Sequence, residues 1–157
     1  MRLSILLLLS VLSVCSFASE VCKLRQELHR GWQKWKKAQI YSYTYMLYVP
    51  PEEGTYYTET VVEVVDNKVV KVTFYEKYTD DSSANTVTVL SNYSGSTMEQ
   101  LYKRCKNTYL RRNPRSHVFT LSIEDNGVLT ACGTDPDPPV GEGQYDGWKM
   151  SEFTLKP

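Results

Sequence analysis

The sequence predicts an α+β fold in which an antiparallel sheet of about six strands carries two helices packed on one face. The expected order is helix, three or four strands, helix, three strands. In segments 21–38 and 97–111, apolar residues recur every three or four positions, as on one side of an amphipathic helix. Elsewhere they alternate with polar residues, which is the period of a strand. Tight turns at 66–68 and 126–127 join successive strands, and hairpins make a sheet antiparallel.

The first eighteen residues are typical of a secretory signal peptide. Met1-Arg2 supplies a positive start, Leu3 to Val14 is an apolar run broken only by serines, and Ser16-Phe17-Ala18 places small residues at the −3 and −1 positions of a cleavage site. The run is too short for a membrane span, and a core helix is the less favoured alternative. We expect cleavage after Ala18, which leaves 19–157 as a single secreted domain.

The first helix of the domain is expected at 21–38. Its apolar stripe consists of Val21, Leu24, Leu28, Trp32 and Trp35. Gly31 is a weak point of this helix, because glycine is less favourable than alanine in a helix by about 1 kcal/mol. We interpret this glycine as a place where another element approaches closely beside Trp32.

A strand is expected next at 40–49, with Tyr41, Tyr43 and Tyr45 on one face, before Pro50-Pro51 ends it. We favour packing of the three rings beneath the tryptophans of the first helix, because a short link joins helix to strand. Their hydroxyl groups would then reach the rim of the sheet. The alternative is an exposed aromatic platform that binds a polysaccharide or a protein.

A hairpin and a short edge strand follow. The hairpin consists of strand 55–65, the turn Asp66-Asn67-Lys68 and strand 69–78. Alternation along the second strand predicts that Val70, Val72 and Phe74 face inward. Residues 86–89 are expected to add the edge strand.

The second helix is expected at about 97–111. Ser96-Thr97-Met98-Glu99 matches a capping box, in which the hydroxyl group satisfies the first free amides while Glu99 reaches back. The inward stripe is Met98, Leu101, Cys105 and Tyr109. Asn113-Pro114 ends the helix.

The last part of the chain predicts a second hairpin and a final strand. Strands at 118–123 and 128–132 flank Asn126-Gly127, a strong two-residue turn signal. Residues 134–147 form a loop rich in Pro, Gly and Asp, and 148–155 reads as the last strand.

Three cysteines remain after the predicted cleavage, and an oxidising compartment favours pairing two of them. We predict a Cys105–Cys132 disulfide, because Cys105 lies on the inward stripe of the second helix and Cys132 ends a strand at a similar level. The rival Cys22–Cys105 bond closes a longer loop, but the entropy gain of about 1 kcal/mol does not decide between them. In the favoured pairing Cys22 is free and could link two molecules into a disulfide-bonded dimer.

Charge excludes some partners. The chain has 18 basic and 18 acidic residues, and a near-neutral surface predicts no long-range attraction for nucleic acid or an anionic membrane. One basic patch stands out, formed by Lys103, Arg104, Lys106, Arg111, Arg112 and Arg115. We interpret it as a solvated helix face whose charges favour the helix C-terminus.

No constellation of residues predicts catalysis, a cofactor or a metal site. His29 and His117 are the only histidines, and a Cys105–His117 pair is disfavoured because Cys105 is expected in a disulfide. Oxygen ligands for extracellular calcium could come from Asp135, Asp137, Glu142 and Asp146, but their loop lacks the glycine and the ligand spacing of an EF-hand loop, so we favour a solvated loop. Asn92-Tyr93-Ser94 is an N-glycosylation sequon in a polar loop, and we expect a glycan on Asn92.

Four motifs in order resemble a known family. They are Trp35-x7-Tyr43-Thr44-Tyr45, Asp66-Asn67-Lys68-Val69-Val70-Lys71-Val72, Thr97-Met98-Glu99-Gln100-Leu101-Tyr102 and Ser151-Glu152-Phe153. This signature is similar to that of an exported domain-of-unknown-function family, found in bacterial secreted proteins and in shell-matrix-like secreted proteins of marine invertebrates. The resemblance implies no catalytic residues. Relatives often carry Cys-x-Cys where this chain has Tyr48-Val49-Pro50-Pro51, so it implies no disulfide pairing either.

These observations predict a secreted, extracellular, non-enzymatic protein. We expect a structural or binding component of an extracellular matrix, with a calcified shell matrix as the setting that the resemblance implies, and a matrix protein or polysaccharide as partner. The alternative is a secreted binding module such as an inhibitor or venom-like effector, although the Gln-x-Val-x-Gly loop of cystatins is missing. A small hydrolase is the least favoured interpretation.

Overall fold

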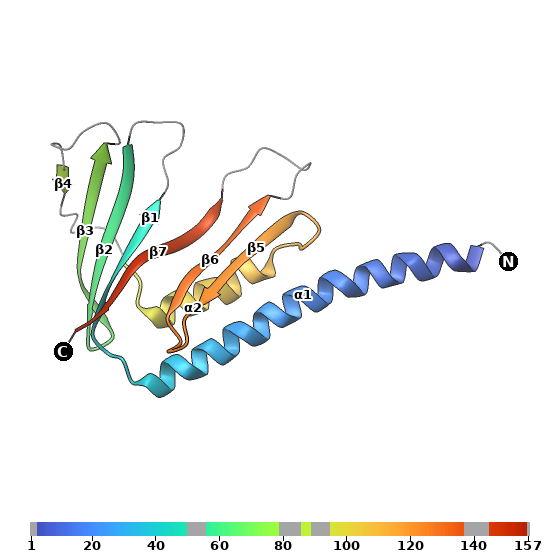
Figure 1. Cartoon of the computed structure of the whole chain (residues 1–157), viewed down its shortest axis with the longest axis horizontal. Coiled ribbons are helices and arrows are strands. Elements are labelled where there is room, and N and C mark those ends of the chain that lie inside the picture. The colour runs from blue at the N-terminus through green and yellow to red at the C-terminus, as the bar shows by residue number, and fades with distance from the viewer. Residues whose placement is uncertain (1–2, 50–55, 79–85, 89–94, 137–144, 157) are drawn as a thin grey trace.

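The computed structural model describes residues 3–49, 56–78, 86–88, 95–136 and 145–156, and it has the expected α+β fold (Figure 1). The helices are α1 (Leu3–Ala38), α2 (Met98–Asn107) and the short 3-10 helix η1 (Tyr109–Arg111). The strands are β1 (Tyr43–Val49), β2 (Tyr56–Val65), β3 (Lys68–Tyr78), β4 (Thr86–Thr88), β5 (His117–Ile123), β6 (Leu129–Pro136) and β7 (Asp146–Leu155). They form one antiparallel sheet in the order β4-β3-β2-β1-β7-β6-β5. The final strand β7 therefore joins the first four strands to the second hairpin.

Both helices cover the same face of this sheet, as predicted. The Trp35 ring of α1 packs edge-on against Tyr43 of β1, with ring centroids 5.4 Å apart. The backbone N–H of Met98, at the start of α2, donates to Tyr43 Oη at 2.6 Å. Because one side chain of β1 touches both helices, the two helices share its side of the sheet.

The helix α1 includes the predicted signal peptide. Its buried stripe within the domain begins at Val21 and continues with Leu28 and Trp35. The residues before this stripe run beyond the sheet (Figure 1). Cleavage after Ala18 stays a prediction, and it would leave the stripe intact. Among the described residues, no helix is both long enough and apolar enough to cross a membrane.

Tyr43 and Tyr45 are core residues, so the interpretation of an exposed aromatic platform is wrong for both. Their side chains are 0% and 1% exposed, because β1 runs directly beneath the two helices. Tyr45 Oη donates to the Ser96 carbonyl oxygen at 2.5 Å, just before α2. Tyr41 is 52% exposed, and it precedes β1. Its carbonyl oxygen accepts a hydrogen bond from Asn67 N–H at 2.8 Å.

The helix α2 begins one residue later than the predicted capping box. Thr97 is the N-cap: its Oγ1 accepts from Gln100 N–H at 3.3 Å, and Gln100 Oε1 accepts from Thr97 N–H at 2.8 Å. The predicted Ser96–Glu99 box is therefore wrong. Ser96 N–H points instead to Tyr45 Oη at 3.2 Å, so the sheet holds Ser96 outside the helix.

A β-bulge turns one predicted core residue outward. Glu63 of β2 pairs with Lys71, but the next residue, Val64, pairs with Val69, so the extra residue Val70 has no cross-strand partner. Val70 is 57% exposed, and the prediction that it faces inward is wrong. The bulge breaks the alternation of the strand at this one position.

The turn at Asn126-Gly127 forms the β5–β6 connection, but the loop is longer than two residues. Gly127 N–H donates to the Glu124 carbonyl oxygen and Glu124 N–H to the Val128 carbonyl oxygen, each at 2.9 Å. Gly127 has a φ of 87°, which glycine adopts without strain. A β-carbon there would also collide with the backbone nitrogen of Trp35, so the loop lies directly against α1.

Candidate functional site

A groove of about 330 Å³ lies between α1 and α2. Its lining consists of Arg25, Leu28, His29, Trp32, Glu99, Tyr102, Lys103 and Lys106. Leu28 and Tyr102 are only 4% and 5% exposed and form an apolar floor, whereas the charged residues lie exposed along the rim. Wide apolar pockets with a few polar groups are the usual form of small-ligand sites.

Two helical stripes explain why these residues meet. On α1, Arg25, His29, Trp32 and Lys36 follow at spacings of four, three and four, so they share one side of the helix. On α2, Glu99, Lys103 and Lys106 follow at spacings of four and three. The stripe of α1 lies next to its buried residues, and it faces the stripe of α2 across the groove.

Gly31 sets how closely the helices approach. A β-carbon at Gly31 would lie 2.7 Å from Tyr102 Oη and 2.8 Å from Ile123 Cδ1, closer than such atoms pack. The close approach that the sequence predicted at this glycine is therefore present. It brings the α1 backbone against α2 and β5 and places Trp32 at the edge of the groove.

The floor of the groove is held in place by its own contacts. Tyr102 Oη donates to the Gly127 carbonyl oxygen at 2.9 Å. Burial raises the pKa of Tyr102 well above its ordinary value, so the phenol stays a neutral donor. The Trp32 ring packs against Tyr102, with centroids 5.2 Å apart, and Lys36 Nζ lies 5.9 Å from the Trp32 centroid. The contact with Tyr102 therefore orients the half-buried indole of Trp32, and the Lys36 cation lies beside it.

The helical layer is strongly basic, although the chain as a whole is neutral. Residues 19–38 contain six Lys and Arg against two Glu, and residues 98–115 contain six against one. Eleven of these twelve basic side chains are exposed, and Arg112 is partly buried. The acidic excess lies in the remaining segments, which carry the sheet and its loops. The near-neutral net charge of the whole chain conceals this separation.

Some of these cations already have partners. Arg25 Nη2 donates to the Leu110 carbonyl oxygen at 2.8 Å, which anchors α1 to η1. Lys103 pairs with Glu99 at 3.4 Å, but both side chains are exposed and such a pair contributes little. Within the described part of the chain, His29 and Lys106 make no ion pair or hydrogen bond. Both side chains remain available to a ligand.

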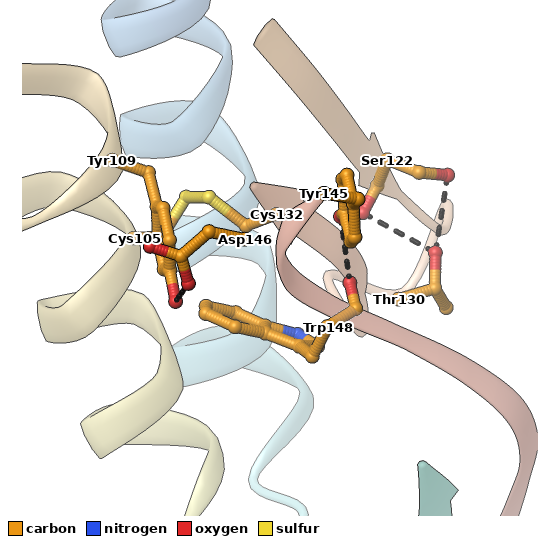
Figure 2. The surroundings of a disulfide bond; sticks show 8 residues. All are labelled: Cys105, Tyr109, Ser122, Thr130, Cys132, Tyr145, Asp146 and Trp148. Atoms are coloured by element: carbon orange, nitrogen blue, oxygen red, sulfur yellow. Dashed lines mark hydrogen bonds between the residues drawn. A yellow bond between two sulfur atoms is a disulfide. The ribbon is translucent and has the colours of Figure 1, made fainter. Parts of the chain in front are cut away.

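A second cluster surrounds the disulfide bond (Figure 2). Cys105 of α2 is bonded to Cys132 of β6, with Cα atoms 5.8 Å apart, which is the pair favoured from the sequence. Both cysteines are fully buried beside Tyr109 and Trp148, whose rings lie edge to face at 5.6 Å. Cys22 is free and exposed.

The neighbouring charges of this cluster are also satisfied. Arg112 binds Asp146 and donates to Thr134 Oγ1 at 2.7 Å. Tyr109 Oη donates to Asp146 Oδ1 at 3.3 Å. Arg104 lies over the rings of Tyr109 and Trp148. This cluster fastens α2 and η1 to the sheet, and its charged groups are paired, whereas the buried Trp148 Nε1 has no hydrogen-bond partner among the described residues.

The remaining predicted site residues do not form a reactive centre. Cys105 is in a disulfide, so it cannot pair with His117 as a nucleophile, and His117 Nδ1 lies 3.0 Å from Ser116 Oγ. Among the described residues, no group of three or more His, Cys, Asp or Glu side chains could hold a metal ion. Asn92 lies outside the described residues, so its glycosylation stays a prediction.

Sequence reasoning missed the groove, although part of its signal is readable. On α1, Arg25 and Lys36 lie on the same side of the helix as Trp32, next to the core stripe. This arrangement indicates a basic rim beside an aromatic ring. The pairing with α2 is not readable from spacing. Comparison with family models, with curated proteins and with solved structures finds no match for this chain.

Proposed function

We propose that this chain is a secreted, non-enzymatic component of an extracellular matrix, and that the groove between α1 and α2 is its binding face. The observation that carries the proposal is the groove itself, an apolar floor with a cationic rim held in position by the fold. A preorganised pocket of this kind binds without paying for rearrangement.

The setting is supported by the sequence. The predicted signal peptide and the disulfide favour an exported protein. The four ordered motifs resemble an exported family with shell-matrix-like members, which makes a calcified shell matrix the setting we favour.

A matched pair of variants tests this function. Lys103→Glu with Lys106→Glu reverses two charges on the rim, whereas Lys34→Glu with Lys37→Glu makes the same change at exposed α1 residues that do not line the groove. The purified domain is mixed with insoluble extracellular matrix, both native and demineralised, and the bound fraction is measured. We expect the wild type and the α1 control to bind and the rim variant to stay in solution. A wild-type protein that stays in solution with both matrices would contradict the proposal.

A further inference from the structure

We infer that the ligand of this groove is an acidic polysaccharide, with a sugar ring lying on Trp32 and its anionic groups on the cationic rim. This inference rests on the proposed function and names the chemistry of its ligand. Three features of the groove support it: its charge, its aromatic wall and its depth.

The charge of the groove selects an anion. Lys103, Lys106 and Arg25 border it, and its one acidic residue, Glu99, is already paired with Lys103. Lys36, whose Nζ lies 5.9 Å from the Trp32 ring centroid, adds a cation beside the groove, so a chain with repeated negative charges meets a cation beyond the lining residues as well. Repeated weak contacts of this kind add up along a polymer.

The aromatic wall selects a ring-shaped group. Trp32 is half-buried, and its contact with Tyr102 fixes the orientation of the indole. A sugar ring offers a flat C–H face to an aromatic surface while its sulfate or carboxylate groups project sideways, toward the rim. A ligand with both features uses the floor and the rim at the same time.

The depth of the groove disfavours a membrane. Leu28 and Tyr102 are almost completely buried, so the apolar residues lie at the bottom of the groove. A protein that inserts into a bilayer needs apolar side chains that project beyond its charges. A volume of about 330 Å³ suits a short stretch of one chain, at the lower end of the usual range for ligand pockets.

Direct binding measurements test the inference. Heparin oligosaccharides supply a sulfated chain, hyaluronan supplies a chain with carboxylates alone, and neutral dextran is the uncharged control. Poly-dT, poly-glutamate and phosphatidylserine vesicles represent the other anionic partners. We expect a saturable affinity for at least one acidic glycan and none for dextran. The Lys103→Glu/Lys106→Glu variant should lose about tenfold or more in affinity, against about twofold for Lys34→Glu/Lys37→Glu.

Replacement of the indole separates ring stacking from charge. Trp32→Leu should weaken glycan binding, and Trp32→Tyr, which keeps a ring, should retain most of it. Circular dichroism checks that both variants fold, and a folded Trp32→Leu variant that binds the glycan as tightly as the wild type would refute the stacked sugar ring.

Each of the other outcomes would refute a specific part of the inference. Equal losses in the rim variant and the α1 control would place binding outside the groove. Tighter binding of poly-dT, poly-glutamate or vesicles through the same residues would replace the polysaccharide with that partner. A protein that binds matrix through the groove but no acidic glycan would refute this inference and leave the proposed function standing, whereas failure to bind matrix would refute both.

Discussion

Tyr43 Oη accepts a hydrogen bond from the backbone N–H of Met98, so a side chain of the first strand fixes the first residue of the second helix. The first amides of a helix have no partner within the helix, and a buried one needs a partner from elsewhere. Tyr45 holds Ser96, two residues before Met98, by accepting from its N–H and donating to its carbonyl oxygen. The tyrosines at alternate positions of β1 therefore serve to attach α2 to the sheet.

We predict that Tyr43→Phe destabilises the domain by about 1–3 kcal/mol, because the buried amide of Met98 loses its acceptor while the ring is kept. Tyr41→Phe is the matched control. Tyr41 is largely exposed, so Tyr41→Phe should change the free energy of unfolding by no more than about 0.5 kcal/mol. Urea unfolding of the two variants measures both. Equal stabilities of the two would show that Tyr43 Oη does not support α2.

Buried tyrosines also predict a loss of stability at alkaline pH. Burial raises the pKa of Tyr43, Tyr45 and Tyr102 above the ordinary value near 10, and it raises the pKa of Tyr145 to about 12. In the unfolded chain these phenols ionise first, so the folded state binds more protons above pH 10. The contribution of these tyrosines to the free energy of unfolding should therefore be constant between neutral pH and about pH 10, and it should fall as the pH rises toward 12.

Unfolding in urea at several pH values between neutral and strongly alkaline measures this decline. Tyr102→Phe removes one raised pKa, so its profile should fall less steeply than that of the wild type, whatever its stability at neutral pH. A Tyr102→Phe profile as steep as the wild type would contradict the assignment.

Local sequence signals predicted the elements well and their exact registers less well. Alternation identified β3, but the bulge at Val70 depends on how β2 and β3 pair, which alternation in one strand does not report. The capping motif identified the start of α2, but two overlapping capping boxes fit this segment, one beginning at Ser96 and one at Thr97. Tyr45 selects the Thr97 box by binding Ser96, and that contact joins residues far apart in sequence.

The candidate site was harder to predict than the fold for the same reason. Each helix shows its own stripe of polar residues, and each stripe alone resembles a solvated face. The groove exists because Gly31 lets α1 approach Tyr102, so the site depends on the packing of two helices that are separated by four strands. Net charge was also uninformative, because the basic helices and the acidic remainder cancel in the sum.

We predict that replacing Cys105 and Cys132 together by alanine destabilises the domain by about 3 kcal/mol or more, since a bond across 27 residues constrains the unfolded chain and both side chains are buried. Cys22→Ser is the control and should be neutral, because Cys22 is exposed and free. Chemical unfolding under non-reducing conditions compares them. Peptide mapping that finds Cys22 bonded to Cys105 or Cys132 within one chain would contradict the pairing.

We propose that the free Cys22 links two molecules through a disulfide bond after secretion. Its exposure makes the thiol accessible to a second copy. Non-reducing electrophoresis of secreted protein should show a dimer that reduction converts to monomer, and Cys22→Ser should give monomer in both conditions. A dimer that persists in Cys22→Ser would refute this link.

Alanine at Gly31 should destabilise the domain, although it favours a helix. In an ordinary helix interior, glycine to alanine stabilises by about 1 kcal/mol, because alanine has the higher helix propensity. At Gly31 the added carbon would lie 2.7 Å from Tyr102 Oη and 2.8 Å from two carbons of Ile123. Ile123 can shift, but Tyr102 Oη is held by its hydrogen bond to Gly127. Overpacking costs of about 1–3 kcal/mol should outweigh the propensity gain, so we expect Gly31→Ala to destabilise the domain.

A double-mutant cycle with Tyr102→Phe isolates the cause of that loss. Removing the hydroxyl group takes away the shortest contact of the added carbon, so Gly31→Ala should cost less in the Tyr102→Phe background than in the wild type. The residual cost would then report the contact with Ile123. Urea unfolding of the four proteins gives the coupling energy. If Gly31→Ala raises the free energy of unfolding by the usual increment in both backgrounds, the helices do not meet at Gly31 as described, and the floor of the groove must be placed differently.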